Sequence, residues 1–112
     1  MRIIAASVCL LLVTNTFAQN REPDWKSIEE ETLVHFRALL QFDTSDPPGR
    51  ELPAAEYIRD VLEAEGIAVE MLATDSERPN VLARLKGNGS KLPLLLMAHT
   101  DVVNVDPEKW TF

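Results

Sequence analysis

The residues of this sequence best suited to chemistry stand at the end of an apolar run. His99 and Asp101 follow residues 92–98, which carry no charge. Such a run is typical of a strand buried on both faces, as in parallel sheets covered by helices, where ligands gather beyond the carboxyl ends of the strands. Because side chains alternate along a strand, His99 and Asp101 are expected on one side. The carboxylate can then fix the imidazole tautomer while the other ring nitrogen binds a metal.

The triplet His-x-Asp is a weak signal alone, because a histidine at a strand end is more often a satisfied polar residue than a metal ligand. The longer string over residues 97–103 (Met-Ala-His-Thr-Asp-Val-Val), continued over 105–112, resembles the first metal motif of the aminoacylase and glutamate carboxypeptidase family of zinc peptidases. That family includes acetylornithine deacetylase and succinyl-diaminopimelate desuccinylase. The resemblance is tightest over 94–112 and extends loosely back to residue 28. Asn104 departs from the pattern, since many relatives have Pro there, and should affect loop stiffness more than chemistry.

The resemblance implies that His99 is a zinc ligand and that Asp101 is its carboxylate partner in catalysis. It also implies zinc as cofactor, two ions in the full-length enzyme, with the other ligands and the general-base Glu beyond Phe112. Catalytic zinc normally has three protein ligands and one open position, so the chain alone is expected to be inactive.

The function that the resemblance implies is zinc-dependent hydrolysis of amide bonds in peptides or N-acyl-amino acids, by a carboxypeptidase or a deacylase. The alternative is a non-catalytic α/β module for binding or interaction, in which His-x-Asp is structural or degenerate. Downstream sequence would distinguish the two, because the enzyme needs further acidic ligands, an adjacent Glu-Glu pair and a distal His.

The elements expected to position the motif are two helices followed by three strands. Ser27 and Glu30 fit a capping box, apolar residues then recur at helical spacing, and Gly66 is placed to end the second helix. We expect an α/β fold over residues 28–112, the N-terminal part of a zinc-peptidase catalytic domain with an incomplete sheet. The helices are expected over 28–42 and 51–65, and the strands over 67–73, 81–86 and 92–98. Residues 43–49 should break the chain between the helices, and Asn88-Gly89 favours a hairpin turn.

Several other residues have both a plain and a functional interpretation. His35 lies between apolar positions of the first helix and is expected at its surface or boundary. Trp110 and Phe112 could wall a substrate pocket, although packing of the loop after the strand is favoured. Residues 43–49 could shape a substrate-facing edge, but a connection between helices is favoured. Residues 88–90 form a formal glycosylation sequon, for which the turn interpretation is preferred.

Residues 1–18 have the three parts of a secretory signal peptide. Arg2 supplies the positive end, an apolar centre follows, and residues 16–18 form a small-x-small cleavage site before Gln19. We therefore expect a secreted or periplasmic protein, with residues 19–27 as a flexible lead-in. Cys9 is the only cysteine and would leave with the signal, so thiolate ligands and a cysteine nucleophile are not expected.

Composition limits the remaining function classes. The 112 residues leave room for one small domain, read here as the N-terminal part of a longer protein. Loss of Arg2 would leave 10 Lys and Arg against 18 Asp and Glu, a formal net charge of −8. An acidic chain without a basic cluster argues against nucleic-acid and membrane-surface partners. A peptide or N-acyl-amino-acid substrate is the expected partner, and the sequence does not indicate an oligomeric state.

Overall fold

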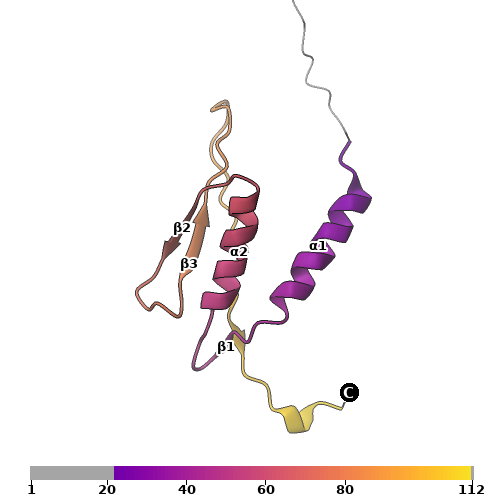
Figure 1. Ribbon diagram of the computed structural model, residues 1–112, viewed down its shortest axis with the longest axis vertical. Coiled ribbons are helices and arrows are strands. Elements are labelled where there is room, and N and C mark those ends of the chain that lie inside the picture. Colours follow the sequence, from indigo (N-terminus) through magenta and orange to yellow (C-terminus); the bar gives the residue numbers. More distant parts are fainter. Residues whose placement is uncertain (1–21, 112) are drawn as a thin grey trace, which may run out of the picture.

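The computed structural model describes residues 22–111 and contains two helices, four short strands and one 3-10 turn. In chain order these are α1 (Trp25–Leu39), β1 (Ser45–Asp46), α2 (Leu52–Ala64), β2 (Val69–Leu72), β3 (Asn80–Ala83), β4 (Val102–Val103) and the 3-10 turn (Pro107–Lys109). Figure 1 shows α2 lying along the β2–β3 hairpin, with α1 on the other side of α2. The expected signal peptide lies outside the described residues.

Helix α1 begins three residues earlier than predicted. Its N-cap is Asp24, whose Oδ1 accepts a hydrogen bond from the backbone N–H of Ser27 at 3.2 Å. The expected cap at Ser27 is wrong because Asp24 satisfies a first-turn N–H just as well and lets the helix include Trp25. Residues 25–27 of the expected lead-in are therefore helical. The helix also ends earlier than expected, at Leu39, and leaves Phe42 outside it.

Helix α2 matches its predicted limits to within a residue at each end. Ala54 and Ala55 face inward and are the only hydrophobic residues in the described part of the chain that are buried. Gly66 ends the helix as predicted: its φ is +75°, and the N–H of Ile67 donates to the carbonyl of Leu62 at 2.9 Å. A positive φ at this position favours glycine, because other residues clash with their own backbone there.

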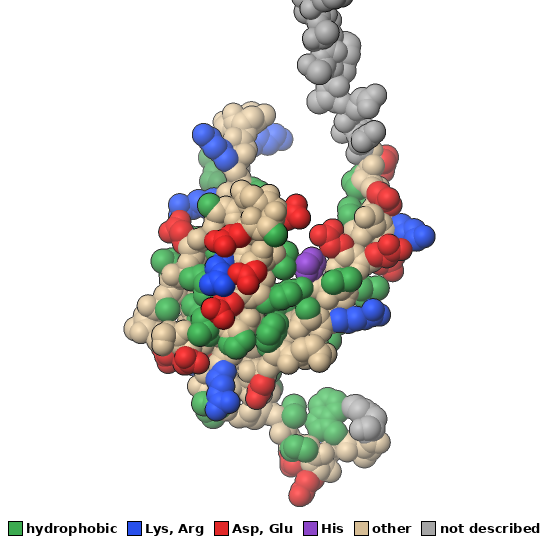
Figure 2. Space-filling model, in the orientation of Figure 1, with side chains coloured by type: hydrophobic (Ala, Val, Ile, Leu, Met, Phe, Trp, Pro, Cys, Tyr) green, Lys and Arg blue, Asp and Glu red, His purple; other side chains and the backbone are tan. Residues whose placement is uncertain are grey.

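The two helices are joined by an aromatic contact. The Tyr57 hydroxyl lies 2.8 Å from Nδ1 of His35. The centroid of the Tyr57 ring is 5.8 Å from that of the Phe42 ring. Figure 2 shows hydrophobic side chains gathered between the helices and acidic side chains on their flanks. His35 is half-buried and serves this helix–helix contact, in agreement with the boundary position predicted for it.

Strands β2 and β3 form an antiparallel hairpin in which Val69 pairs with Ala83 and Leu72 with Asn80. Both are shorter than predicted, but both lie within or next to the expected ranges. The turn between them contains Arg78, whose N–H donates to the carbonyl of Asp75 at 3.0 Å. The other sheet is parallel and consists of β1 and β4, with Ser45 paired with Val102 and Asp46 with Val103.

The third predicted strand differs most from the structure. Residues 92–98 form no strand, and their large apolar side chains are exposed, up to 93 % at Leu92. A strand needs a hydrogen-bonded neighbour, and no segment of the described chain supplies one here. The hairpin predicted at Asn88-Gly89 is wrong, because no strand of the described chain adjoins it on either side. The chain only bends there, with Gly89 at φ +79° and the Ser90 N–H donating to Asn88 Oδ1. Among the described residues, no helix has the length and apolar character needed to cross a bilayer.

Candidate metal-binding motif

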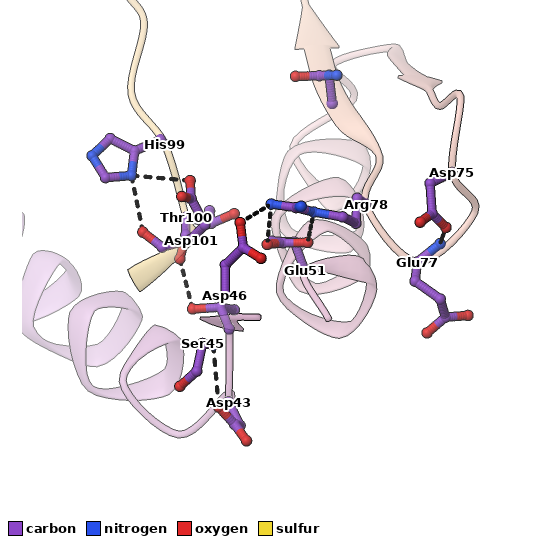
Figure 3. Close-up of polar contacts among 12 residues, drawn as sticks. Asp43, Ser45, Asp46, Glu51, Asp75, Glu77, Arg78, His99, Thr100 and Asp101 are labelled. Carbon is purple, nitrogen blue, oxygen red and sulfur yellow. Dashed lines mark hydrogen bonds and ion pairs between the residues drawn. The ribbon is translucent and has the colours of Figure 1, made fainter. Parts of the chain in front are cut away.

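His99 and Asp101 lie together, as the sequence predicts. Nδ1 of His99 is 3.2 Å from Asp101 Oδ1 and 2.9 Å from the backbone carbonyl oxygen of the same residue. The His99 side chain is 82 % exposed and that of Asp101 is 46 % exposed. Figure 3 shows the imidazole turned away from the other labelled side chains except Asp101.

This contact defines which nitrogen of His99 can bind a ligand. Both neighbours of Nδ1 are acceptor oxygens, so Nδ1 carries the proton in the neutral ring. Nε2 then holds the lone pair, and within the described part of the chain it has no hydrogen-bond partner. A neutral imidazole with one nitrogen bonded to a carboxylate and the other open is the arrangement that metal-binding histidines adopt in proteins.

The motif is attached to a loop that precedes it by more than fifty residues. The Thr44 hydroxyl donates to the carbonyl of Thr100 at 2.6 Å, and the Val102 N–H donates to the carbonyl of Thr44 at 3.1 Å. Directly afterwards β1 and β4 pair. Further along, the Asn104 side-chain amide donates to the carbonyl of Pro47 at 3.0 Å. The segment from Thr100 to Asn104 is therefore bound to residues 44–47 along its whole length.

An ion cluster holds the same loop from its other side. Arg78 donates from Nε to Glu51 Oε2 at 3.0 Å and from Nη2 to Asp46 Oδ2 at 2.9 Å (Figure 3). The Glu51 side chain is only 7 % exposed, so its charge is satisfied within the protein. Its carboxylate, followed by that of Asp46, raises the pKa of Arg78 above the usual value. Arg78 thus joins the β2–β3 turn to the start of α2 and to β1.

Gly49 allows Arg78 to take this position. Its φ is +75°, and a β-carbon placed on it would lie 2.7 Å from Nε and 2.8 Å from Cζ of Arg78. Such distances are too short for unbonded atoms, so a β-carbon at this position would displace the guanidinium. Asp43 also stabilises the loop, since hydrogen bonds from Ser45 hold the pKa of the Asp43 carboxyl below its usual value.

Two hollows adjoin the motif. One, of about 710 Å³, is lined by His99 and Asp101 together with Glu51, Arg78 and Leu96, among others. The other, of about 320 Å³, lies between the end of α1 and the motif and is lined by Thr44 and His99 among others. Of the two residues considered as pocket walls, Trp110 lines neither hollow, and Phe112 lies outside the described residues.

A zinc site needs more ligands than the motif supplies. Within residues 22–111, no three His, Cys, Asp or Glu side chains are grouped so that they could hold a metal ion. His99 therefore fits the chemistry of one zinc ligand, with the carboxylate of Asp101 on its second nitrogen. A zinc site built on His99 would need further ligands from outside this group.

Sequence reasoning found the pair at the motif but missed the residues that hold it. The sequence assigns no individual role to Thr44, Glu51 or Arg78. Their contacts join positions 27 to 56 residues apart, and no local spacing encodes such contacts. The one local signal is the loop at residues 43–49, for which the sequence favours a connection between helices.

Comparison with known proteins places the chain near two kinds of amide hydrolase. It is 38% identical over 86 residues to an N-formyl-4-amino-5-aminomethyl-2-methylpyrimidine deformylase of Halalkalibacterium halodurans, with 73% of this chain and 20% of that protein covered. It is 28% identical over 85 residues to a probable succinyl-diaminopimelate desuccinylase of Staphylococcus aureus strain Mu50, with 75% of this chain and 20% of that protein covered.

The chain spans about a fifth of the length of these curated relatives. No protein-family model matches it, and no solved structure does either. The resemblance to the desuccinylase group noted from the sequence is supported at this level: the chain is similar to part of a deformylase and part of a desuccinylase.

Proposed function

We propose that this chain is the N-terminal part of a zinc-dependent hydrolase that cleaves amide bonds, and that His99 is one of its zinc ligands. The observation that carries the proposal is the geometry of His99, whose Nδ1 contacts Asp101 while Nε2 is open and exposed. The similarity to a deformylase and a desuccinylase supports the reaction class. Both of those names describe removal of an acyl group, so we favour a deacylase over a carboxypeptidase.

The residues of this chain have separable roles in such an enzyme. Zinc would act as a Lewis acid and lower the pKa of a bound water to about 7. His99 would hold the ion through Nε2, and Asp101 would keep the proton on Nδ1 and orient the ring. A carboxylate partner of this kind strengthens a histidine as a metal ligand. The hollow of about 710 Å³ beside the motif leaves room for an acyl-amine substrate next to His99.

The test compares variants of the full-length protein at the motif. His99→Ala should deplete zinc and abolish turnover of N-formyl and N-succinyl amines, because it removes a ligand. Asp101→Asn should lower zinc affinity or turnover by roughly 10- to 100-fold, the usual effect of losing a carboxylate partner of a metal ligand. Metal content is measured by atomic emission and folding by circular dichroism.

His35 provides the matched control, because it is the only other histidine in the sequence and lies in the contact between the helices. His35→Gln should retain zinc and turnover. If His99→Ala keeps wild-type zinc content and activity, the metal assignment is wrong. The alternative of a non-catalytic binding module would then take its place.

A further inference from the structure

Thr44 is a buried residue of the loop before α2 and makes two hydrogen bonds to the motif. Its side chain sits in a nearly closed position, with only 5 % of the residue exposed. Its hydroxyl donates to the carbonyl of Thr100 at 2.6 Å, and its own carbonyl accepts from the Val102 N–H at 3.1 Å. Both bonds end on residues next to His99 and Asp101.

We propose that Thr44 is a positioning residue for the metal-binding motif, which it fixes through the two bonds to Thr100 and Val102. The inference rests on the proposed function for its metal readout, although the bonds themselves are properties of this structure. Thr44 touches neither the imidazole nor a metal, and acts by fixing the backbone from which His99 and Asp101 project.

The geometry explains why one hydroxyl has this effect. Residues 92–98 make no ladder hydrogen bonds, so the chain before His99 gives the motif no support from a sheet. Support begins at Thr100, with the Thr44 hydroxyl, and continues through the pairing of Ser45 with Val102. The Thr44 bond is therefore the first fixed point on the His99 side of the motif.

The loop that carries Thr44 is itself fixed. Asp46, two residues later, is bonded to Arg78, which also holds the buried carboxylate of Glu51. A continuous series of hydrogen bonds therefore connects the β2–β3 turn to the loop and the loop to the motif. A hydroxyl on a mobile loop could not fix the position of the motif. The loop of Thr44 is instead bonded, through Arg78, to the start of α2 and to the hairpin.

The test separates the hydroxyl from the shape of the side chain in the full-length protein. Thr44→Val keeps the size and loses the donor, whereas Thr44→Ser keeps the donor. Apo-protein is titrated with zinc alone by calorimetry. Thr44→Val should bind zinc roughly 10-fold more weakly, at the lower end of the range for residues that orient metal ligands. Thr44→Ser should stay within about 3-fold of the wild-type zinc affinity, because it keeps the hydroxyl donor. Cobalt-substituted Thr44→Val should also show an altered visible spectrum, while Thr44→Ser should not.

Tyr57→Phe is the matched control, because it also removes one side-chain hydrogen bond but does so between the helices. It should leave zinc affinity unchanged. If Thr44→Val does not fold, Thr44→Ala, which lacks the donor and fits the same space, takes its place. Wild-type zinc affinity in the donor-free variant, or equal losses in Thr44→Ser and Thr44→Val, would overturn the proposal.

A measurement without metal distinguishes this inference from the proposed function. Hydrogen exchange of the Val102 amide reports the bond to Thr44 directly. If wild-type protein binds no zinc, the proposed function fails. The positioning role is then retained only if the Val102 amide exchanges faster in Thr44→Val than in Thr44→Ser, and equal exchange rates refute it.

Discussion

Replacement of Gly49 by alanine tests whether the loop before α2 is built around Arg78. The first cost is the backbone: at a φ of +75°, a side chain destabilises the folded state by about 1–2 kcal/mol. The second cost is steric, because the new β-carbon would lie 2.7 Å from Arg78 Nε and would force the guanidinium aside. The Glu51 carboxylate would then lose a charge-assisted hydrogen bond in a buried position, which costs about 1–3 kcal/mol more.

Gly66 supplies a close control for the backbone cost. It has the same φ of +75°, but a β-carbon there meets no atom within 4 Å. Gly66→Ala should therefore lower the free energy of unfolding by the backbone cost alone, about 1–2 kcal/mol. The difference between the two variants, about 1–3 kcal/mol, isolates the contact with Arg78. Urea unfolding of both variants in the same background, followed by circular dichroism, measures it.

A double-mutant cycle of Gly49→Ala and Arg78→Ala tests the contact between the two positions directly. In an Arg78→Ala background the obstacle is gone, so adding Gly49→Ala should cost no more than Gly66→Ala does. If Gly49→Ala alone destabilises the protein no more than Gly66→Ala, the close approach of Arg78 to the loop does not exist in solution. The account of how the loop is fixed would then be refuted.

Three further outcomes are expected. Tyr57→Phe should lower the free energy of unfolding by about 1 kcal/mol, as measured by urea unfolding, because it removes a half-buried hydrogen bond between the helices; an unchanged stability would contradict this. Hydrogen bonds from Ser45 lower the pKa of Asp43, so the stability they provide should be present above the unfolded pKa of about 3.9 and be lost as the pH falls through the lower folded value. Asp43→Asn should lack this loss in acid unfolding, and an identical acid transition would refute it. Mass spectrometry of the exported protein should find Gln19 as its first residue, and a mature chain that still begins at Met1 would rule out the cleavage.

The helical part of the fold was predictable because its signals are local. Periodic apolar residues and the glycine at position 66 placed α2 to within a residue at each end. At the start of α1, Asp24 and Ser27 are both good capping residues three positions apart, and sequence alone does not decide between them. The structure selects Asp24, which adds almost a turn to the helix.

The apolar run shows where local pattern fails. Residues 92–98 have the composition of a buried strand, but burial depends on what the rest of the chain supplies. In the described residues nothing pairs with this segment, and Leu94 and Leu96 are each 83 % exposed. The segment has the apolar composition of a buried strand, but it lacks the hydrogen-bonded neighbour that a strand requires. The contact between His99 and Asp101 forms nevertheless, because the two residues are adjacent enough to meet without a sheet.

Asn104 stands where many members of the family that the sequence resembles have Pro, and its side chain makes a contact that Pro could not make. A proline at that position would stiffen the loop through its fixed φ, but its side chain has no hydrogen-bond donor. The Asn104 side chain instead donates to the carbonyl of Pro47. This bond holds the far end of the motif, whereas Thr44 holds the end next to His99. The expectation that Asn104 affects loop stiffness more than chemistry stays a prediction. This bond joins positions 57 residues apart, and both ends of the motif contact the same early loop.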